Sequence, residues 1–177
     1  FACCKQIKED LVQLNIPEEV KEIIATNRKI SSIKDPVERI KALLDHNQML
    51  EARKEILVIN KVKQLNEILN YTCLKGHADL IDLIISKGAN DYNRATEAAA
   101  GGGHMEIVQL MIAQGADDYN EAMAYAAEKG HMEIVQLMIA QGANNYNWAM
   151  ASAARRGHVE IVQLMIAKGA DDYSRAM

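Results

Sequence analysis

Four histidines stand at a regular interval and are the first residues whose type and spacing could do chemistry. Each follows a glycine, and the pairs recur every 27 residues: Gly76-His77, Gly103-His104, Gly130-His131 and Gly157-His158. Imidazoles bind metals and carry protons, so such a series suggests a metal site or a pH sensor. Zinc, however, needs ligand atoms about 2.0–2.1 Å away, whereas neighbouring helices pack roughly 10 Å apart. We therefore predict no metal site and expect each histidine to form a hydrogen bond at a helix junction.

No other residues have the types and spacing of a catalytic or cofactor site. The sequence has no Ser-centred elbow, His-Glu-x-x-His or Cys-x-x-Cys motif. The glycine run at 101–103 follows no predicted strand, so it does not predict a phosphate loop. Methionines at equivalent positions, Met111, Met138 and Met165, are expected to fill a core rather than line a Met-rich groove. We expect no enzymatic activity and no cofactor.

Composition narrows the choice of compartment and partner. The net charge of −4 lacks the basic excess typical of nucleic-acid binding. There is no run of about 18 apolar residues, so no membrane span is expected. The three cysteines, Cys3, Cys4 and Cys73, have no disulfide-framework spacing, which favours a reducing, intracellular compartment. The adjacent pair Cys3-Cys4 could bind metal, but we interpret both as ordinary thiols.

The histidines belong to a longer repeated segment. Residues 104–116 and 131–143 are identical, HMEIVQLMIAQGA, and residues 158–170 differ from them only at Val159 and Lys168. A fixed period of this size is typical of a stacked array in which each unit contacts its neighbours. The chain begins at Phe1, not methionine, and stops where another unit would begin, so we expect further sequence at both ends.

Each unit is predicted to form two helices. In the unit at 119–145, Gly130 ends an alanine-rich first helix because glycine takes a left-handed conformation cheaply. Asp118 and Glu121 have the spacing of a capping box. The second helix is apolar on most sides, which is typical of a helix packed between others. Only a narrow stripe, formed by Glu133, Gln136 and Ala140, is expected to face solvent.

The segment from Ala126 to Ile139, followed by Gly142-Ala143, resembles the ankyrin repeat, and the resemblance covers about residues 63–177. It implies an all-α solenoid of helical hairpins that binds other proteins. Ankyrin repeats usually run about 33 residues, and the missing residues fall just before Tyr146. Two or three residues cannot form two strands and a turn, so we expect the β-hairpin fingers to be reduced or absent. The short period resembles ankyrin-like proteins of large DNA viruses, which implies a host cytoplasm or a virion as location.

The first 62 residues lack the repeat consensus but still predict helices. The expected helices are Lys5–Leu14, Pro17–Thr26, Pro36–Asp45 and Gln48–Ile59. This region is a cap, a set of degenerate repeats or a separate module. Residues 62–76 have the pattern of a divergent first helix, so the array is predicted over 63–177, with about four repeats and the last one cut off.

Differences between units indicate a binding surface. The second helices hardly change, whereas the first helices vary at positions that fall on one helix face. In ankyrin-like arrays the first helices line the concave side. Since Trp, Tyr and Arg are enriched in binding hot spots, we expect partner contacts there; neutral drift on a solvated face is the alternative. The expected contact residues are Arg94, Glu121, Tyr125, Glu128, Trp148, Ser152, Arg155 and Arg156.

These features are compatible with two functions. The first is a scaffold whose concave face binds a partner protein. The second is an architectural component of a larger assembly, such as a viral particle, that uses the ends and edges of the array.

Overall fold

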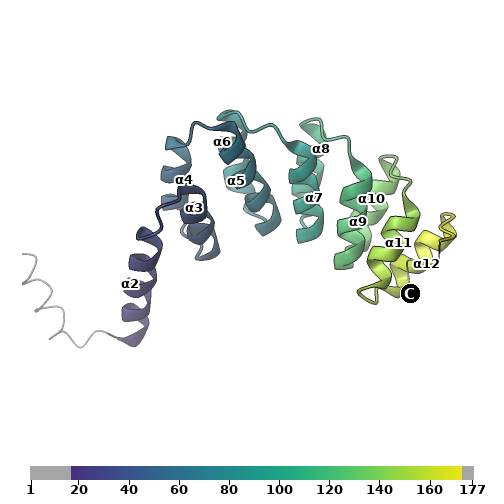
Figure 1. Ribbon diagram of the computed structural model, residues 1–177, viewed down its shortest axis with the longest axis horizontal. Coiled ribbons are helices and arrows are strands. Elements are labelled where there is room, and N and C mark those ends of the chain that lie inside the picture. Colours follow the sequence, from purple (N-terminus) through teal and green to yellow (C-terminus); the bar gives the residue numbers. More distant parts are fainter. Residues whose placement is uncertain (1–16, 173–177) are drawn as a thin grey trace, which may run out of the picture.

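The computed structural model describes residues 17–172, and this part of the chain consists of helices and turns with no strand (Figure 1). The helices are α2 (Glu18–Ser31), α3 (Pro36–Asp45), α4 (Met49–Val58), α5 (Val62–Lys75), α6 (Ala78–Ser86), α7 (Tyr92–Gly102), α8 (Met105–Ala113), α9 (Tyr119–Lys129), α10 (Met132–Ala140), α11 (Tyr146–Ala154) and α12 (Val159–Ala167). The predicted all-α solenoid is confirmed, and the junctions between these units have no β-hairpin fingers.

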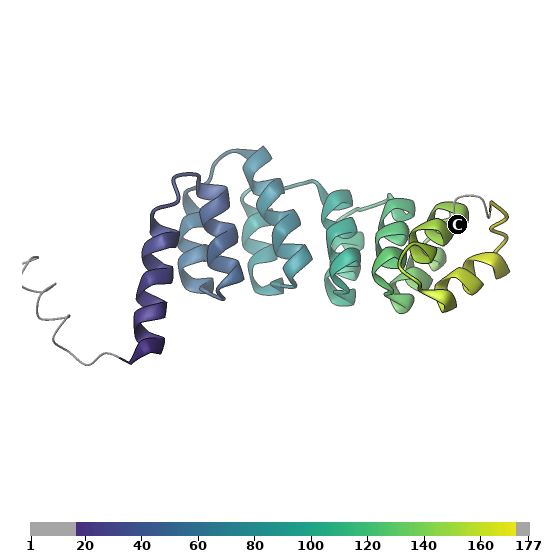
Figure 2. The same ribbon diagram turned by 60° about the horizontal axis from the view of Figure 1, so that its bottom comes forward.

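The helices form two layers. The first helices α5, α7, α9 and α11 pack against one another in order, and each second helix packs on the first helix of its own unit. Figure 1 shows the array as an arch with the turns between units along its outer edge, and Figure 2 shows the same order from another angle. The Gly-His ends of the first helices lie on the inner side of this arch, while the sides of the first helices form a broad face toward the viewer.

Small side chains let the first helices lie close together. Ala95, Ala99, Ala122 and Ala126 are fully buried between them. The larger apolar side chains come from the second helices, as in Ile134, Val135 and Met138 of α10. Because Met111, Met138 and Met165 are all fully buried, the prediction that these methionines fill the core is confirmed.

Three of the four Gly-His turns also join neighbouring units. Nε2 of His104, His131 and His158 lies 3.1, 3.3 and 3.0 Å from the carbonyl oxygens of Leu74, Gly101 and Glu128, at the end of the preceding first helix. A carbonyl only accepts, so the ring nitrogen donates. The predicted hydrogen bond at the helix junction is confirmed for these three histidines.

Glycine is required at position 103 for two reasons. Gly103 has φ +79°, a left-handed conformation that glycine adopts without strain. A Cβ added to Gly103 would also lie 2.6 Å from Cε1 of His131 in the next unit. The glycine therefore ends its own helix and leaves room for the following histidine.

An asparagine in each first helix anchors the turn of the next unit. Oδ1 of Asn93 accepts hydrogen bonds from the backbone N–H groups of Asp117 and Asp118, at 2.8 and 3.2 Å. Oδ1 of Asn66, Asn120 and Asn147 makes the same pair of bonds one unit apart, to residues 90 and 91, 144 and 145, and 171 and 172. These bonds hold the short turns in place where a finger is lacking.

The predicted capping box at Asp118 and Glu121 is wrong. The Asp118 side chain makes no capping bond to its own helix. The Asp118 N–H that Glu121 would have bonded is already held by Asn93. In the neighbouring units Asp91 and Asn145 do cap their helices, accepting from the N–H groups of Arg94 and Trp148.

The described N-terminal helices agree with the predicted bounds to within one residue except at one end. α3 has the predicted bounds, and its Asp35 cap accepts from the N–H of Glu38. α2 was expected to end at Thr26 but continues to Ser31, because Ile30 is buried in the core. The expected helix Lys5–Leu14, together with Cys3 and Cys4, lies outside the described residues.

Candidate functional site

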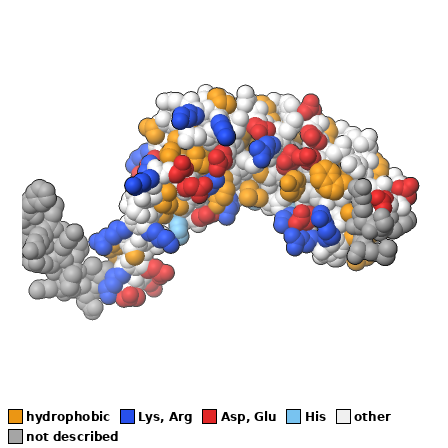
Figure 3. All heavy atoms as spheres, viewed as in Figure 1, with side chains coloured by type: hydrophobic (Ala, Val, Ile, Leu, Met, Phe, Trp, Pro, Cys, Tyr) orange, Lys and Arg blue, Asp and Glu red, His pale blue; other side chains and the backbone are white. Residues whose placement is uncertain are grey.

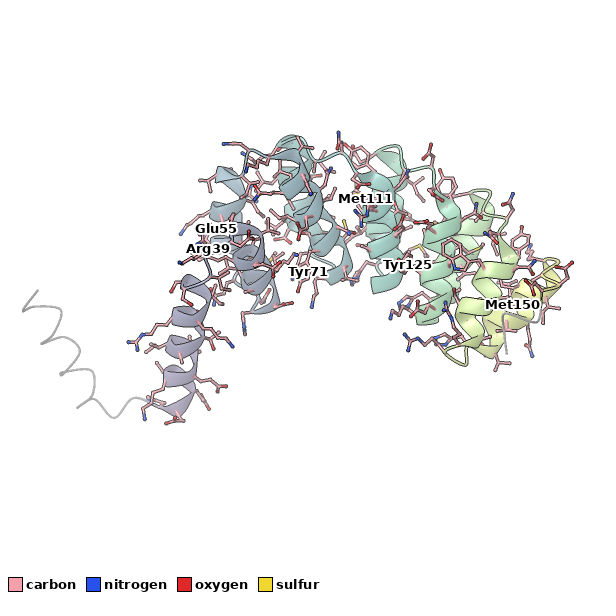
Figure 4. All side chains as sticks on the ribbon, in the orientation of Figure 1. Arg39, Glu55, Tyr71, Met111, Tyr125 and Met150 are labelled. Carbon is pink, nitrogen blue, oxygen red and sulfur yellow. The ribbon has the colours of Figure 1, made fainter. Side chains whose placement is uncertain are left out.

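The predicted contact residues lie on or beside the face formed by the first helices. Arg94, Tyr125, Trp148, Arg155 and Arg156 are exposed. Glu121 and Glu128 are half-buried. Tyr125 extends from α9 on this face in Figure 4. Tyr125 and Trp148 keep 45% and 36% of their surface exposed, so both aromatic side chains are available to a partner.

Ser152 was predicted to be exposed on this face, and that prediction is wrong. Only 2% of its surface is accessible. Nη2 of Arg155 lies 3.4 Å from the Ser152 hydroxyl, so the arginine side chain reaches back over the serine. Any contact with a partner at this point would be made by Arg155.

Two of the predicted residues bind each other. The Nη2 and Nε atoms of Arg156 lie 2.8 and 3.2 Å from Oε1 of Glu128, which links the turn after α11 to the end of α9. This hydrogen bond to Arg156 is the main cause that lowers the pKa of Glu128. Lys129 lies 3.7 Å from the same carboxylate oxygen. Figure 3 shows Lys and Arg side chains gathered around an acidic side chain on the lower side of the molecule, in its right half.

A groove runs along the same face between α5 and α7. Its two parts have volumes of about 620 and 270 Å³ and share Asn70 and Arg94. The larger part is lined by Val62, Lys63, Asn66, Glu67, Asn70, Asp91 and Arg94. The smaller part is lined by Asn70, Leu74, Arg94, Glu97, Ala98, Gly101, Tyr125 and Lys129. The groove thus includes the predicted residues Arg94 and Tyr125.

Asn70 and Glu97 also line this groove but were not predicted from the sequence. These two residues occupy equivalent positions in successive units, where the next two units have Ala124 and Ala151. The change from polar to apolar along this row is visible in the sequence. It was not recognised because asparagine, glutamate and alanine are not the aromatic and arginine residues on which the prediction of contacts rested.

Glu97 has an unusual electrostatic environment. Its pKa rises to about 7, because burial disfavours the carboxylate, a hydrogen bond joins it to Glu121, and the charges of Glu121 and Asp118 lie nearby. Only Arg94 opposes this rise. Figure 3 shows acidic side chains gathered over α7 and α9 on this face. Near neutral pH Glu97 is therefore partly protonated.

Three further observations concern metal binding, membrane crossing and thiol chemistry. Within residues 17–172, no group of three or more His, Cys, Asp and Glu side chains could hold a metal ion. No helix in the same range is long and apolar enough to cross a bilayer. Cys73 is buried, and burial raises the pKa of its thiol to about 12, so this thiol stays protonated near neutral pH.

Residues 96–176 match the family model for ankyrin repeats, in three copies. This part of the chain is similar to ankyrin repeats. No curated protein matches the chain. Ankyrin repeats generally mediate protein–protein interaction and typically form non-enzymatic scaffolds. The surface that varies between the repeats of this chain is therefore a candidate for contact with another protein.

Proposed function

We propose that this chain is a recognition scaffold that binds a partner protein through the face of its first helices. The observation that carries the proposal is the exposure of Tyr125 and Trp148 on a face where the unit sequence varies. Aromatic residues of this kind contribute roughly 2 kcal/mol or more when they lie at the centre of an interface. The groove along α5 and α7 continues this surface and provides a recess beside Tyr125.

Affinity capture with matched variants tests this function. The double variant Tyr125→Ala, Trp148→Ala would be compared with the double variant Glu133→Ala, Gln136→Ala, which changes exposed residues of α10. A protein retained by the wild type and the α10 variant but lost from the aromatic variant would support the proposal. Its direct binding would then be measured with purified components. Identical sets of captured proteins from both variants would contradict it.

An architectural role is the second candidate, and exposed apolar side chains favour it. Leu50, Leu57 and Val58 are exposed on α4. A larger assembly, for which the short-period resemblance suggests a viral particle in an infected cell, would bury such side chains. In that case Leu57→Ser and Val58→Ser would disrupt assembly, while the aromatic variant would leave it unchanged.

We further propose that α3 and α4 form a degenerate unit of the array rather than a separate module. Asn47 has φ +55° at the turn between them, the left-handed conformation that glycine takes in the other units. The N–H groups of Asn47 and Gln48 bond to the carbonyls of Leu44 and Leu43, as those of Gly76 and His77 bond to Cys73 and Thr72. Gln48 also reaches back to Asn27 of α2, as the histidines reach back to the preceding unit.

A further inference from the structure

We propose that the smaller part of the groove, where Gly101 of α7 lies beside α9, binds the carboxylate of an aspartate or glutamate side chain of the partner protein. The carboxylate would accept hydrogen bonds from the Tyr125 hydroxyl and the Lys129 ammonium. This inference rests on the proposed function, because it assumes a protein on the first-helix face. It adds the chemistry of one contact, which the family and the fold do not specify.

The junction between α3 and α5 shows how this molecule holds such a carboxylate. Asp45, at the end of α3, accepts a hydrogen bond of 2.7 Å from the Tyr71 hydroxyl and pairs with the Lys75 ammonium at 2.8 Å. Tyr71 and Lys75 are four residues apart on α5, so they lie on the same face of that helix. A tyrosine and a lysine at this spacing therefore form a site for one carboxylate of the neighbouring helix.

The helix α9 carries the same two donors. Tyr125 and Lys129 stand at the positions of this tyrosine and lysine, two units further along the chain, and both are exposed. Within residues 17–172, the Tyr125 hydroxyl has no hydrogen-bond partner. The Lys129 ammonium lies 3.7 Å from the carboxylate of its chain neighbour Glu128, a longer contact than the 2.8 Å pair of Lys75 with Asp45. Both donors are thus available to an incoming acceptor.

A glycine takes the place of the carboxylate at the junction between α7 and α9. Gly101 corresponds to Asp45. Each stands two residues before the residue with a left-handed φ at its turn, Gly103 in one case and Asn47 in the other. An added Cβ at Gly101 would lie 3.9 Å from Cβ of Tyr125, which is an ordinary contact, so a side chain has room there. α7 therefore offers the donors of α9 no carboxylate at this position.

The junction between α9 and α11 repeats the pairing with other residues. Glu128 stands at the position of Asp45, and Arg156 at that of the lysine. Nη2 of Arg156 lies 2.8 Å from Oε1 of Glu128. The described junction between α5 and α7 has leucine and glycine at the two positions, so it has neither charge. Among the described junctions from α3 to α11, the one between α7 and α9 alone has the cation without its carboxylate.

The charges that line this recess leave the Lys129 ammonium for an anion. The recess has a volume of about 270 Å³, and its charged lining residues are Arg94, Glu97 and Lys129. The positive charge of Arg94 acts on Glu97, which lies on the same helix. Burial raises the pKa of Glu97 to about 7, so its repulsion of an anion is weakened near neutral pH. Glu121 and Asp118 do not line the recess.

The uncharged walls of the recess favour an acidic side chain over a small inorganic anion. Leu74 and Ala98 line it together with Tyr125, and Leu74 keeps 43% of its surface exposed. These apolar surfaces can contact the methylene groups of an aspartate or a glutamate. Inorganic phosphate has no apolar part and gains nothing from them.

The first test is an NMR titration of the full chain with tripeptides blocked at both ends. Gly-Asp-Gly, Gly-Glu-Gly and the uncharged control Gly-Gln-Gly would be added up to about 50 mM at constant ionic strength, a range that detects millimolar binding. We expect the amide signals of Ala98, Gly101 and Tyr125 to shift with both acidic peptides and not with the glutamine peptide. Tyr125→Phe should weaken the binding about threefold to tenfold, through loss of one hydrogen bond.

Matched variants and probes make the titration decisive. Lys129→Gln should abolish the shifts that are selective for acidic peptides, whereas Lys168→Gln, at another exposed lysine of the array, should leave them unchanged. Absence of selective shifts in the wild type, or equal shifts in Lys129→Gln, would overturn the inference. Equal binding of inorganic phosphate, or binding only of Gly-Gly-Gly with a free carboxyl end, would also overturn it, because the site would then not be one for an acidic side chain.

A carboxylate supplied by the chain itself provides a second test. Gly101 lies inside α7 without a left-handed φ, so Gly101→Asp introduces no backbone strain. The introduced carboxyl should pair with Lys129 as Asp45 pairs with Lys75. Its pKa, measured by NMR, should be lower in Gly101→Asp alone than in the same variant combined with Lys129→Gln, and Gly101→Asp should no longer bind the acidic peptides. Equal pKa values in the two backgrounds would overturn the inference.

The two proposals fail in different ways. If the peptides do not bind but capture still depends on Tyr125 and Trp148, the proposed function survives and the inference fails. If the peptides bind at the predicted site but capture does not depend on these aromatic residues, the proposed function is contradicted instead.

Discussion

The junctions between repeats and the junction between α3 and α5 are held by different chemistry. Between α7 and α9, Asn93 bonds two backbone N–H groups and His131 bonds a backbone carbonyl. Between α3 and α5, side chains bond side chains: Lys41 pairs with Glu67, and Asp45 accepts from Lys75 at 2.8 Å and from Tyr71 at 2.7 Å. The ammonium groups of Lys41 and Lys75 also lie 5.7 and 5.3 Å from the centre of the Tyr71 ring.

This difference explains why one kind of junction can be copied at every unit. A bond to backbone atoms needs only the right turn geometry, so any unit with the same asparagine and histidine can follow any other. Ion pairs between side chains need matching residues on both helices. α9 repeats the set of α5, with Glu121, Tyr125 and Lys129 at the positions of Glu67, Tyr71 and Lys75, whereas α7 and α11 do not.

Substitutions in the core should have the largest effect on stability. They test whether the repeats and the N-terminal helices depend equally on buried apolar side chains. Ile134→Ala in α10 and Ile56→Ala in α4 each remove a buried side chain and should lower the free energy of unfolding by about 2–5 kcal/mol. Trp148→Ala, at an exposed site, should cost less than about 0.5 kcal/mol. Urea unfolding measures all three, and equal losses for Ile134→Ala and Trp148→Ala would contradict the assignment of faces.

Hydrogen exchange sharpens the same comparison. We expect Ile56→Ala to increase exchange mainly in α2, α3 and α4, because the ion-paired junction to α5 gives weaker coupling than the junctions between repeats. Exchange that increases equally along the whole chain would show that the two kinds of junction couple the units equally.

Glycine variants isolate the contribution of the histidine contacts. Gly103 and Gly157 both have left-handed φ, +79° and +77°, so alanine should cost each about 1–2 kcal/mol of strain. Only at Gly103 would the new Cβ meet a histidine ring, since a Cβ at Gly157 has nothing within 4 Å. Loss of the His131 bond should add about 1 kcal/mol to Gly103→Ala. Equal destabilisation by the two variants in thermal unfolding would mean that the ring contact contributes nothing.

Removal of an asparagine should have the next largest effect. Asn120→Ala leaves the N–H groups of Asn144 and Asn145 without their acceptor and should cost about 1–3 kcal/mol. Asn120→Asp keeps an acceptor oxygen in the same place and serves as the matched control. If both variants lost the same stability in urea, the bonds to the turn would not be the reason for the asparagine.

The repeated part of the fold could be predicted from the sequence because its signals are local. Glycines at fixed intervals end the first helices, and apolar residues at helical spacing give the second helices. The function of Asn120 could not be predicted, because its partners are backbone atoms 24 and 25 residues further on. The error at the capping box has the same origin: Asn93 of the preceding unit had already taken the Asp118 N–H.

The candidate site was predicted only in part for a related reason. Exposure of Tyr125 and Trp148 follows from residue type and helix face, and the structure confirms it. Burial of Ser152 depends on where the Arg155 side chain lies, and no periodicity in the sequence specifies that. The groove is lined by Glu97 and Gly101 of α7 and by Tyr125 of α9, and how these residues of two units lie together must be seen in three dimensions.

The smallest expected effect is a pH dependence of opposite sign in the two regions. The pKa of Asp45 is lowered, first by its hydrogen bond to Lys75 and then by that to Tyr71, so its contribution to stability is present above the ordinary value of 3.8 and is lost as the pH falls through the lowered value. The pKa of Glu97 is raised from 4.5 to about 7, so its contribution is present below about pH 4.5 and is lost as the pH rises through 7. Raising the pH from 5 to 8 should therefore lower the stability of the repeats through Glu97 and leave the contribution of Asp45 unchanged. Acidification below pH 4 should weaken the α3–α5 junction instead. Because Asp45 is exposed and Glu97 is only half-buried, solvent screening keeps each effect small.

Thermal unfolding at several pH values measures this pH dependence of stability. Glu97→Gln should flatten the plot of melting temperature against pH between pH 5 and 8, and Asp45→Asn should flatten it only below pH 4. A Glu97→Gln profile that still declines from pH 5 to 8 would place the titrating group elsewhere and remove the electrostatic distinction between the two regions.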